Sequence, residues 1–291
     1  IKLPDEIDLN TKGNPLDTQN DWKLVTINGK KYTRETDTLD TFVDSSWYFL
    51  RFCSANNVEK AFDAEDINYW MPVDQYIGGI EHAILHLLYS RFFMRAISLD
   101  NKNTKIKEPF KGLFTQGMVC HQTYKNKNNK WISPDEVFSE DGKKFFEKTN
   151  PKNEVIVGPS ESMSKSKKNT IDPEKMIDDY GADAVRLFIL SDSPPEKDIQ
   201  WSENGMSSAF KYIQKFWSMN EKILSVFNKE KTEGNNEINV FTNQSIEKIN
   251  YALEKFRYNV IIAVFHEIYN FFNKISENQQ NFENLKKNYE K

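Results

Sequence analysis

The order strand, double glycine, helix, strand constrains the fold of this chain more than any other feature of its sequence. Residues 73–77 have the pattern of a short strand, Gly78 and Gly79 follow, and a helix is expected from about 81 to 97. Residues 113–120 have the pattern of another strand. Alternating strands and helices are typical of parallel sheets, so we predict an α/β fold with a parallel, doubly wound, Rossmann-like half-domain.

The double glycine also predicts where a ligand binds. Gly78 and Gly79 carry no side chains, and the first N–H groups of the expected helix point outward, so the backbone can approach a nucleotide closely. The helix is apolar on nearly every face, which predicts that it is buried. In open α/β sheets, ligands bind beyond the carboxyl ends of the strands.

The second half of the chain has a different character. Apolar residues recur at helical spacing, which predicts an all-α helical bundle after the α/β part. They are Met206, Phe210, Ile213, Trp217, Leu224 and Phe227, then Ile246, Ile249, Leu253, Phe256, Val260, Val264, Ile268, Phe271 and Ile275. Residues 229–237, with Gly234, are expected to form the loop between these stripes.

A lysine-rich segment precedes the predicted bundle. Residues 158–168 are small and polar and are expected to form a loop, which carries Lys165, Lys167 and Lys168. Asp172 and Pro173 then have the pattern of a helix N-cap and first helical residue. A mobile lysine loop ahead of a helix is suited to anions, although a solvated surface loop is the simpler interpretation.

Composition narrows the class of protein. The 291 residues carry a formal net charge of −4, which excludes a globally basic nucleic-acid coat but allows local basic patches. The sequence contains only two cysteines and no apolar run of membrane-spanning length, so we expect a cytoplasmic protein with no membrane partner. The chain starts without methionine and ends within a helical pattern, so we expect a piece of a longer protein.

Glu81, His82 and His86 form a second candidate site. Two histidines at i and i+4 share one helix face and are able to hold a metal. In zinc proteases the glutamate follows the first histidine, whereas here it precedes both. A metal hydrolase, two core histidines and a substrate pocket therefore all remain open at this point.

Several motifs resemble one family. Met163-Ser164-Lys165-Ser166 matches four of the five residues of the Lys-Met-Ser-Lys-Ser signature of class I aminoacyl-tRNA synthetases. Residues 78–92 closely resemble a helix of the leucyl-tRNA synthetases of bacterial type. Further matches lie at residues 34–42, 45–48, 116–119, 172–174 and 180–188, in the order found in that family. The resemblance covers nearly the whole chain.

The resemblance implies a set of site residues. The leucine side chain would lie against Phe42, Ser45, Tyr76, His82 and His86. The ATP ribose would contact Gly79 and Glu81, and Gln116, Met118 and Val119 would lie beside the nucleotide. Lys165 would be the catalytic residue and contact the phosphates. The other signature residues, Met163, Ser164 and Ser166, would also bind ATP. The resemblance implies no metal-ligating residues.

The implied reaction is the ATP-dependent ligation of leucine to tRNA(Leu), with Mg²⁺, by a longer protein that acts as a monomer. The family's His-x-Gly-His motif and editing domain are absent from this sequence, so we expect this piece alone to be inactive. Ser162 stands where the first signature lysine belongs, and Lys167 and Lys168 are the candidates to replace its charge. A non-catalytic tRNA-binding or scaffold module is the alternative.

The resemblance also implies a division of the chain. The predicted segments are a connecting β-ribbon at 1–36, the second half of the catalytic domain at 37–120, a surface insertion at 121–160, the signature loop with its following helices at 161–193, and a truncated anticodon-binding helical domain at 194–291.

Overall fold

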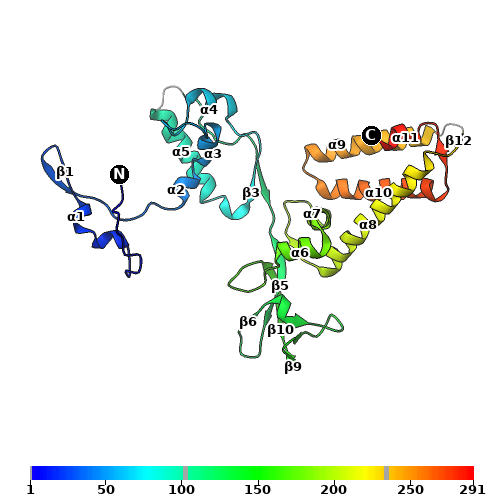
Figure 1. Ribbon diagram of the computed structural model, residues 1–291, viewed down its shortest axis with the longest axis horizontal. Helices are drawn as coiled ribbons and strands as arrows, with labels where there is room; N and C mark the ends of the chain where they lie inside the picture. Colours follow the sequence, from blue (N-terminus) through cyan, green and yellow to red (C-terminus); the bar gives the residue numbers. More distant parts are fainter. Residues whose placement is uncertain (1, 101–103, 233–235) are drawn as a thin grey trace. The chain divides into compact units, whose positions relative to one another are not determined.

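A computed structural model of the chain describes residues 2–100, 104–232 and 236–291 (Figure 1). The chain divides into two compact units. Unit 1 comprises Ile1–Tyr76 with Glu81–Gly112, and unit 2 comprises Ile77–Ile80 with Leu113–Lys291. Of the loop expected at 229–237, residues 233–235 lie outside the described residues. The five predicted segments remain predictions.

Unit 1 contains one hairpin and several short helices. Its elements are η1 (Pro15–Thr18), α1 (Asn20–Lys23), β1 (Leu24–Ile27), β2 (Lys30–Thr33), α2 (Phe42–Ser45), α3 (Tyr48–Cys53), α4 (Ala64–Trp70) and α5 (His86–Asp100). The hairpin turn has positive φ at both Asn28 and Gly29, +50° and +76°. This is the requirement of a type I′ turn, which Asn-Gly meets at low cost.

The core of unit 1 lies among α3, α4 and α5. Phe49 and Leu50 of α3, Ile67 of α4, Met71 after it and Met94 of α5 form one buried cluster. Val73 and Phe110 form a parallel β-bridge beside this cluster, which is the pairing expected when a helix connects two parallel strands.

The expected helix at 81–97 is shorter and less buried than predicted. Ile80–His82 form a 3-10 helix, η2, and α5 begins at His86. One face of α5 buries Leu87, Ser90 and Met94 in unit 1. The prediction of burial all round is wrong, because the exposed apolar residues Ile84, Leu88 and Phe92 lie on another side of this segment.

The predicted strands are also shifted. The first is β3 (Tyr76–Gly79) rather than 73–77, and it pairs with β4 (Leu113–Gln116). The second, expected at 113–120, is divided into β4 and β5 (Val119–Lys125). The division falls at Gly117, whose N–H donates to the carbonyl of Pro195 at 2.8 Å instead of continuing a ladder.

The insertion at 121–160 contains strands and a small core that the sequence did not predict. Its elements after β5 are β6 (Trp131–Ile132), η3 (Pro134–Glu136), β7 (Val137–Phe138), β8 (Phe146–Glu147), β9 (Asn150–Glu154) and β10 (Ile156–Ser162). Tyr124, Ile132, Val137 and Val155 form the core. β10 pairs antiparallel with β5, so residues 158–162 are strand and the expected loop begins only at Met163.

Gly158 lies at an irregularity in this ribbon. The register of β10 against β5 shifts between Val157 and Ser160. A Cβ on Gly158 would lie 2.4 Å from Oγ1 of Thr123, so a larger residue here would have to displace the Thr123 side chain. β5 also pairs in parallel with the short strand β11 (Ile199–Gln200).

Helices dominate the remainder of unit 2. They are α6 (Pro173–Tyr180), α7 (Ala182–Ser191), α8 (Glu203–Val226), α9 (Asn236–Glu254), α10 (Tyr258–Glu277) and α11 (Leu285–Tyr289), with the short strands β12 (Lys231–Thr232) and β13 (Asn281–Phe282) paired between them. Asp172 caps α6 by accepting from the N–H of Glu174 at 3.0 Å, as predicted.

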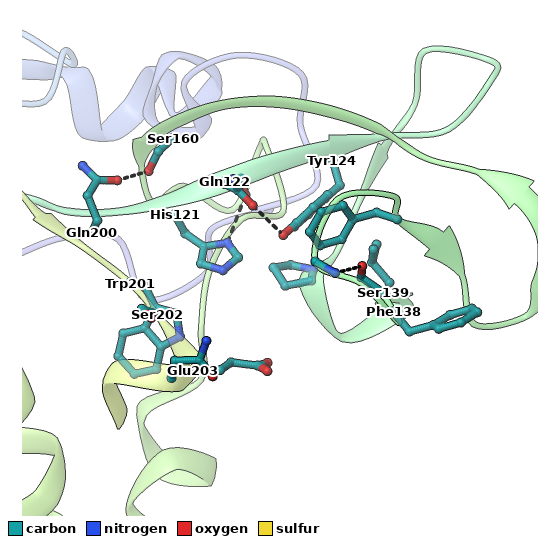
Figure 2. Close-up of a pocket in the computed structure, with 15 residues that line it drawn as sticks. His121, Gln122, Tyr124, Phe138, Ser139, Ser160, Gln200, Trp201, Ser202 and Glu203 are labelled. Atoms are coloured by element: carbon teal, nitrogen blue, oxygen red, sulfur yellow. Dashed lines mark hydrogen bonds between the residues drawn. The ribbon is translucent and has the colours of Figure 1, made fainter. Parts of the chain in front are cut away.

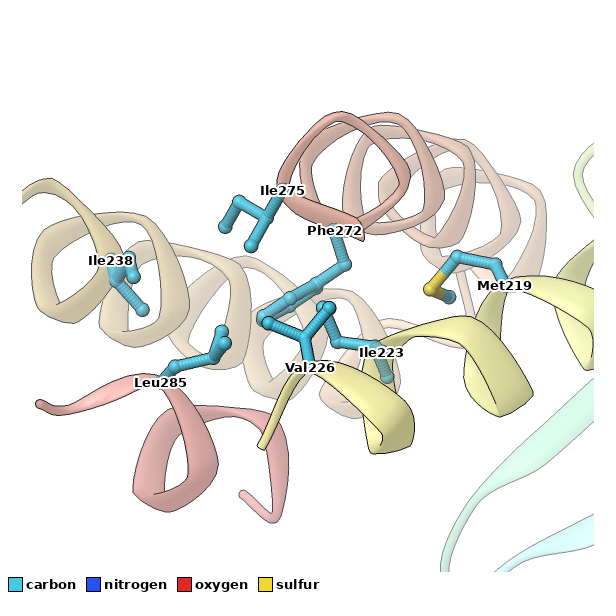
Figure 3. Close-up of a cluster of buried hydrophobic side chains, with 7 residues drawn as sticks. All are labelled: Met219, Ile223, Val226, Ile238, Phe272, Ile275 and Leu285. Carbon is cyan, nitrogen blue, oxygen red and sulfur yellow. The ribbon is translucent and has the colours of Figure 1, made fainter. Parts of the chain in front are cut away.

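The predicted bundle is formed by α8, α9 and α10, which pack together (Figure 1). Its core is shown in Figure 3: Met219, Ile223 and Val226 of α8 meet Ile238 of α9, Phe272 and Ile275 of α10, and Leu285 of α11. No helix within the described residues is long and apolar enough to cross a membrane. The chain thus combines a mixed α/β part with an all-α bundle.

Candidate active site

Three rings of unit 1 are joined by hydrogen bonds. The hydroxyls of Tyr48 and Tyr76 lie 2.8 Å apart, and the Tyr76 hydroxyl lies 2.7 Å from Nε2 of His86. α3 supplies Tyr48, β3 supplies Tyr76 and α5 supplies His86. The Tyr76 ring also stacks on Phe110 with the ring centroids 3.8 Å apart. The network therefore ties three elements together around two predicted leucine contacts.

Burial favours the neutral forms of Tyr76 and His86. It raises the pKa of Tyr76, to which the hydrogen bond with Tyr48 adds. Burial also lowers the pKa of His86, and the nearby His82 lowers it further. Because His86 is neutral, its Nε2 is able to accept from the Tyr76 hydroxyl, while its buried Nδ1 has no partner among the described residues.

The other predicted leucine contacts lie on neighbouring elements of unit 1. Phe42 of α2 stacks with Tyr89 of α5, centroids 6.2 Å apart, and the Ser45 hydroxyl donates to the Phe42 carbonyl at 3.1 Å. The exposed His82 ring lies 6.4 Å from the ring of His86, centroid to centroid. α2 packs against α5, which brings the elements that carry Phe42, Ser45 and His86 together.

A cavity opens beside this network. Tyr48 and Tyr76 line it together with apolar side chains, so one wall is aromatic and carries two hydroxyls. The remaining lining residues are Phe49, Phe52, Cys53, Ala55, Asn56, Trp70, Met71, Val73 and Asp74. An apolar cup with few polar groups is suited to a small aliphatic ligand. Among the predicted leucine contacts, Tyr76 lines this cavity, and the other four do not.

The two histidines have different partners. His82 Nε2 lies 3.7 Å from a carboxylate oxygen of Glu81, and His86 uses its own Nε2 toward Tyr76. In the described part of the chain, no group of three or more His, Cys, Asp or Glu side chains is placed to hold a metal ion. His86 thus takes part in the hydrogen-bond network of unit 1.

The lysine loop lies in unit 2, at the end of β10. Ser162 is the last residue of β10 and pairs with Cys120 of β5. The N–H of Met163 then donates to the carbonyl of Val119 at 3.3 Å, which brings two predicted ATP contacts together. Lys165 and Ser166 follow at the exposed tip of a turn. Lys165 thus lies on an exposed turn whose base is fixed to β5.

The two other lysines of the loop differ from Lys165. The Lys167 ammonium forms an ion pair with the carboxylate of Glu161. Lys168 adopts positive φ, +55°, at the end of the turn and is exposed. The ion pair engages Lys167, so Lys168 is the better candidate to replace the charge that Ser162 lacks.

Met118, a predicted nucleotide contact, is hydrogen-bonded to the segment 198–199. The N–H of Met118 donates to a carboxylate oxygen of Asp198 at 2.8 Å, and the carbonyl of Met118 accepts from the N–H of Ile199 at 2.8 Å. Among the predicted ATP contacts, Glu81 belongs to unit 1, whereas Gly79, Gln116, Met118, Val119 and the loop residues belong to unit 2.

A further cavity lies where the insertion meets the start of α8 (Figure 2). The Ser160 hydroxyl donates to the side chain of Gln200 there, and Tyr124 donates to the side-chain oxygen of Gln122 at 3.2 Å. Burial lowers the pKa of His121 in this wall. None of the predicted site residues lines this cavity.

Sequence reasoning missed three residues that support the site: Tyr48, Asn169 and Asp198. Tyr48 lies in a stretch that matches the family, and Asn169 directly follows the lysine loop, so position along the chain was the only available signal. Nothing in the sequence near Asp198 marks it, since it acts on a backbone 80 residues away.

Comparison with known proteins finds similarity to class I tRNA synthetases. A family model for class I tRNA synthetases (I, L, M and V) matches residues 153–202. The leucine–tRNA ligase of Rickettsia massiliae is 47% identical over 272 residues, which cover 93% of this chain and 32% of that protein. The chain is similar, over nearly its whole length, to one segment of the leucine–tRNA ligases. The resemblance found in the motifs is confirmed.

Other leucine–tRNA ligases agree with this assignment. That of Zymomonas mobilis is 45% identical over 277 residues, covering 94% of the chain. A crystal structure of the ternary complex of Agrobacterium radiobacter K84 agnB2 LeuRS, tRNA and LeuAMS matches with a TM-score of 0.71 and 28% identity, over 95% of this chain and 32% of that one. This match confirms the predicted fold class. The chain spans about a third of the length of the curated relatives it matches.

Proposed function

We propose that the longest natural protein carrying this chain ligates leucine to tRNA(Leu) through a leucyl-adenylate, using ATP and Mg²⁺. Similarity to leucine–tRNA ligases over 93% of the chain supports this activity. The observation in the structure that carries it is Lys165, exposed at the tip of a turn whose base is fixed to β5. The two unpaired cysteines support a reducing, cytoplasmic setting, and the monomeric state stays a prediction.

The chemistry needs no protein nucleophile. The leucine carboxylate attacks the α-phosphorus of ATP, the bond to the bridging oxygen breaks, and pyrophosphate leaves with the electron pair. The acyl group then passes from the adenylate to a ribose hydroxyl of the tRNA. Catalysis is therefore positioning together with stabilisation of negative charge on the phosphates, which is the role we assign to Lys165.

The residues assigned to leucine and those assigned to ATP would have different tasks. The neutral Tyr48–Tyr76–His86 network and its cavity present apolar walls and uncharged polar groups to the leucine side chain. Gln116, Met118 and Val119 would lie beside the nucleotide. Mg²⁺ is commonly held by substrate phosphates with one or two carboxylates, so it would arrive with ATP. The exposed carboxylate of Glu81 fits paired ribose hydroxyls.

The test is leucine-dependent exchange of pyrophosphate into ATP. We expect Lys165→Ala to reduce the exchange rate by about 10²- to 10³-fold, the usual cost of removing one group that stabilises transition-state charge. Lys175→Ala is the matched control, because this exposed lysine lies on α6 and pairs with Asp135. It should retain nearly full activity.

Two outcomes would count against the proposal in different ways. A near-normal rate in Lys165→Ala would remove the role of this lysine. No leucine-dependent exchange in the unmodified protein would remove the ligase activity itself, and would favour a non-catalytic tRNA-binding or scaffold module.

A further inference from the structure

Asn169 is a polar side chain with no exposed surface, located directly after the lysine loop. Its Nδ2 lies 3.2 Å from the carbonyl of His121 on β5, and 3.1 and 3.4 Å from the carbonyls of Glu161 and Ser162 on β10. Its Oδ1 accepts from the N–H of Ser164 at 2.9 Å. One amide therefore contacts both strands of the ribbon and the first part of the turn.

These contacts close the turn at both of its ends. Ser164 and Asn169 enclose the four residues 165–168, and the hydrogen bond between them fixes the distance across the base. Inside the turn, the N–H of Lys168 donates to the carbonyl of Lys165 at 3.3 Å. The position of Lys165 relative to Val119 thus depends on how firmly Asn169 holds this base to β5.

We infer that Asn169 is a positioning residue, which acts through the lysine loop to place Lys165 for adenylate formation. The expected effect on adenylate formation rests on the proposed function, whereas the holding of the lysine loop by Asn169 does not. Buried amides that satisfy several backbone groups at once are costly to remove, because each carbonyl or N–H left behind is unpaired. A displacement of a catalytic group by about 1 Å can lower the reaction rate about 10²-fold.

A purely structural role for Asn169 makes a different prediction. If it only stabilised the β5–β10 ribbon, its loss would lower the stability of unit 2 without a selective effect on the first reaction step. Asn281 allows this comparison. It is 4% exposed in the same unit, and its Nδ2 donates to the carbonyls of Phe227 at 3.3 Å and Lys229 at 2.7 Å, within the bundle.

The experiment compares Asn169→Asp, Asn169→Ala and Asn281→Asp in the longest natural protein that carries this chain. Asn169→Asp keeps the oxygen that accepts from Ser164 and loses the donors to the strands, whereas Asn169→Ala loses both. We expect the kcat of pyrophosphate exchange to fall about 10- to 100-fold in both variants, while the KM for leucine stays unchanged. Transfer of leucine from preformed adenylate to tRNA should stay within about threefold of the unmodified protein.

A second measurement does not depend on activity. Trypsin cleaves after lysine, so native-state cleavage after Lys165, Lys167 or Lys168 reports how well the turn is held. Mass spectrometry of the fragments should show cleavage at these sites at least about fivefold faster in the two Asn169 variants, and unchanged in Asn281→Asp.

The outcomes separate the inference from the proposed function. If the unmodified protein shows no exchange, the function fails, and the cleavage rates still decide whether Asn169 holds the loop. If folded Asn169 variants show normal exchange and normal cleavage, Asn169 does not position the loop. Equal losses in both reaction steps, matched by Asn281→Asp, would also overturn the inference, because they indicate general destabilisation.

Discussion

His86 shows how burial determines the chemistry of a single residue. The residue is 9% exposed, and its Nε2 is hydrogen-bonded to the Tyr76 hydroxyl. Burial and the neighbouring His82 both disfavour the charged ring. The neutral imidazole holds the hydroxyl of Tyr76, which lines the cavity with Tyr48, so this wall carries polar groups without a net charge and suits an aliphatic ligand.

The first prediction concerns the titration of His86. Its pKa should lie below 6.5, the value for an unperturbed histidine, because the folded state favours the neutral ring. The stability that this residue contributes is fully present above pH 6.5 and is lost as the pH falls through its lowered pKa. Assigned NMR spectra of the histidine ring would measure the pKa directly.

A stability comparison checks the sign of this effect. Below pH 6.5 the unmodified chain should lose free energy of unfolding more steeply than His86→Gln, which has no proton to take up. His121→Gln serves as the control for a half-buried histidine whose pKa burial also lowers. A pKa at or above 6.5 for His86 would contradict the neutral network.

Close backbone contacts determine the geometry at the scale of an element. The segment between β4 and β5 is held against the 195–199 segment by hydrogen bonds to Gly117, Met118 and Ile199. A Cβ on Gly117 would lie 2.2 Å from the backbone carbonyl carbon and oxygen of Lys197. Glycine is therefore required here for close approach, not for an unusual φ.

Gly117→Ala should consequently destabilise unit 2. The added methyl has to displace backbone, which typically costs about 1–3 kcal/mol in the free energy of unfolding. Gly78→Ala is the matched control, because a Cβ there would meet no heavy atom within 4 Å. Urea denaturation of both variants measures the difference, and equal stabilities would show that the 195–199 segment moves aside without cost.

At the scale of the whole molecule, the bundle holds the largest buried apolar cluster of the described chain. We therefore expect the stability of unit 2 to depend on this cluster. Its core joins four helices, and Ile223 within it has no exposed surface (Figure 3). Adjacent to Ile223 on the same helix, Leu224 is 54% exposed. Substituting alanine for each of these two neighbours therefore separates the effect of burial on stability from that of helix propensity.

Ile223→Ala should lower the free energy of unfolding of the bundle by about 2–5 kcal/mol, since it removes buried methyl groups and leaves a cavity. Leu224→Ala should change it by less than about 0.5 kcal/mol. Chemical denaturation followed by far-UV circular dichroism detects both. Similar losses in the two variants would mean that the helix packs through a different face.

The sequence alone predicted the features whose signals lie within a few residues. The Asp172 cap and the apolar stripes of the bundle are both local, and backbone conformation or helical period encodes each of them. The family motifs likewise predicted the class of protein, which the comparisons confirmed. The order of elements predicted the α/β class, although the strand limits were shifted.

Only the tertiary structure revealed the contacts that hold the candidate site. β10 is strand because β5, more than 30 residues earlier, supplies its hydrogen-bond partners, and its own small polar residues carry no strand pattern. The Tyr48–Tyr76 pair is 28 residues apart, and Asn169 bonds to a carbonyl 48 residues away. Such side chains gain their roles from residues that folding brings close. A local sequence pattern does not indicate which distant residues these are.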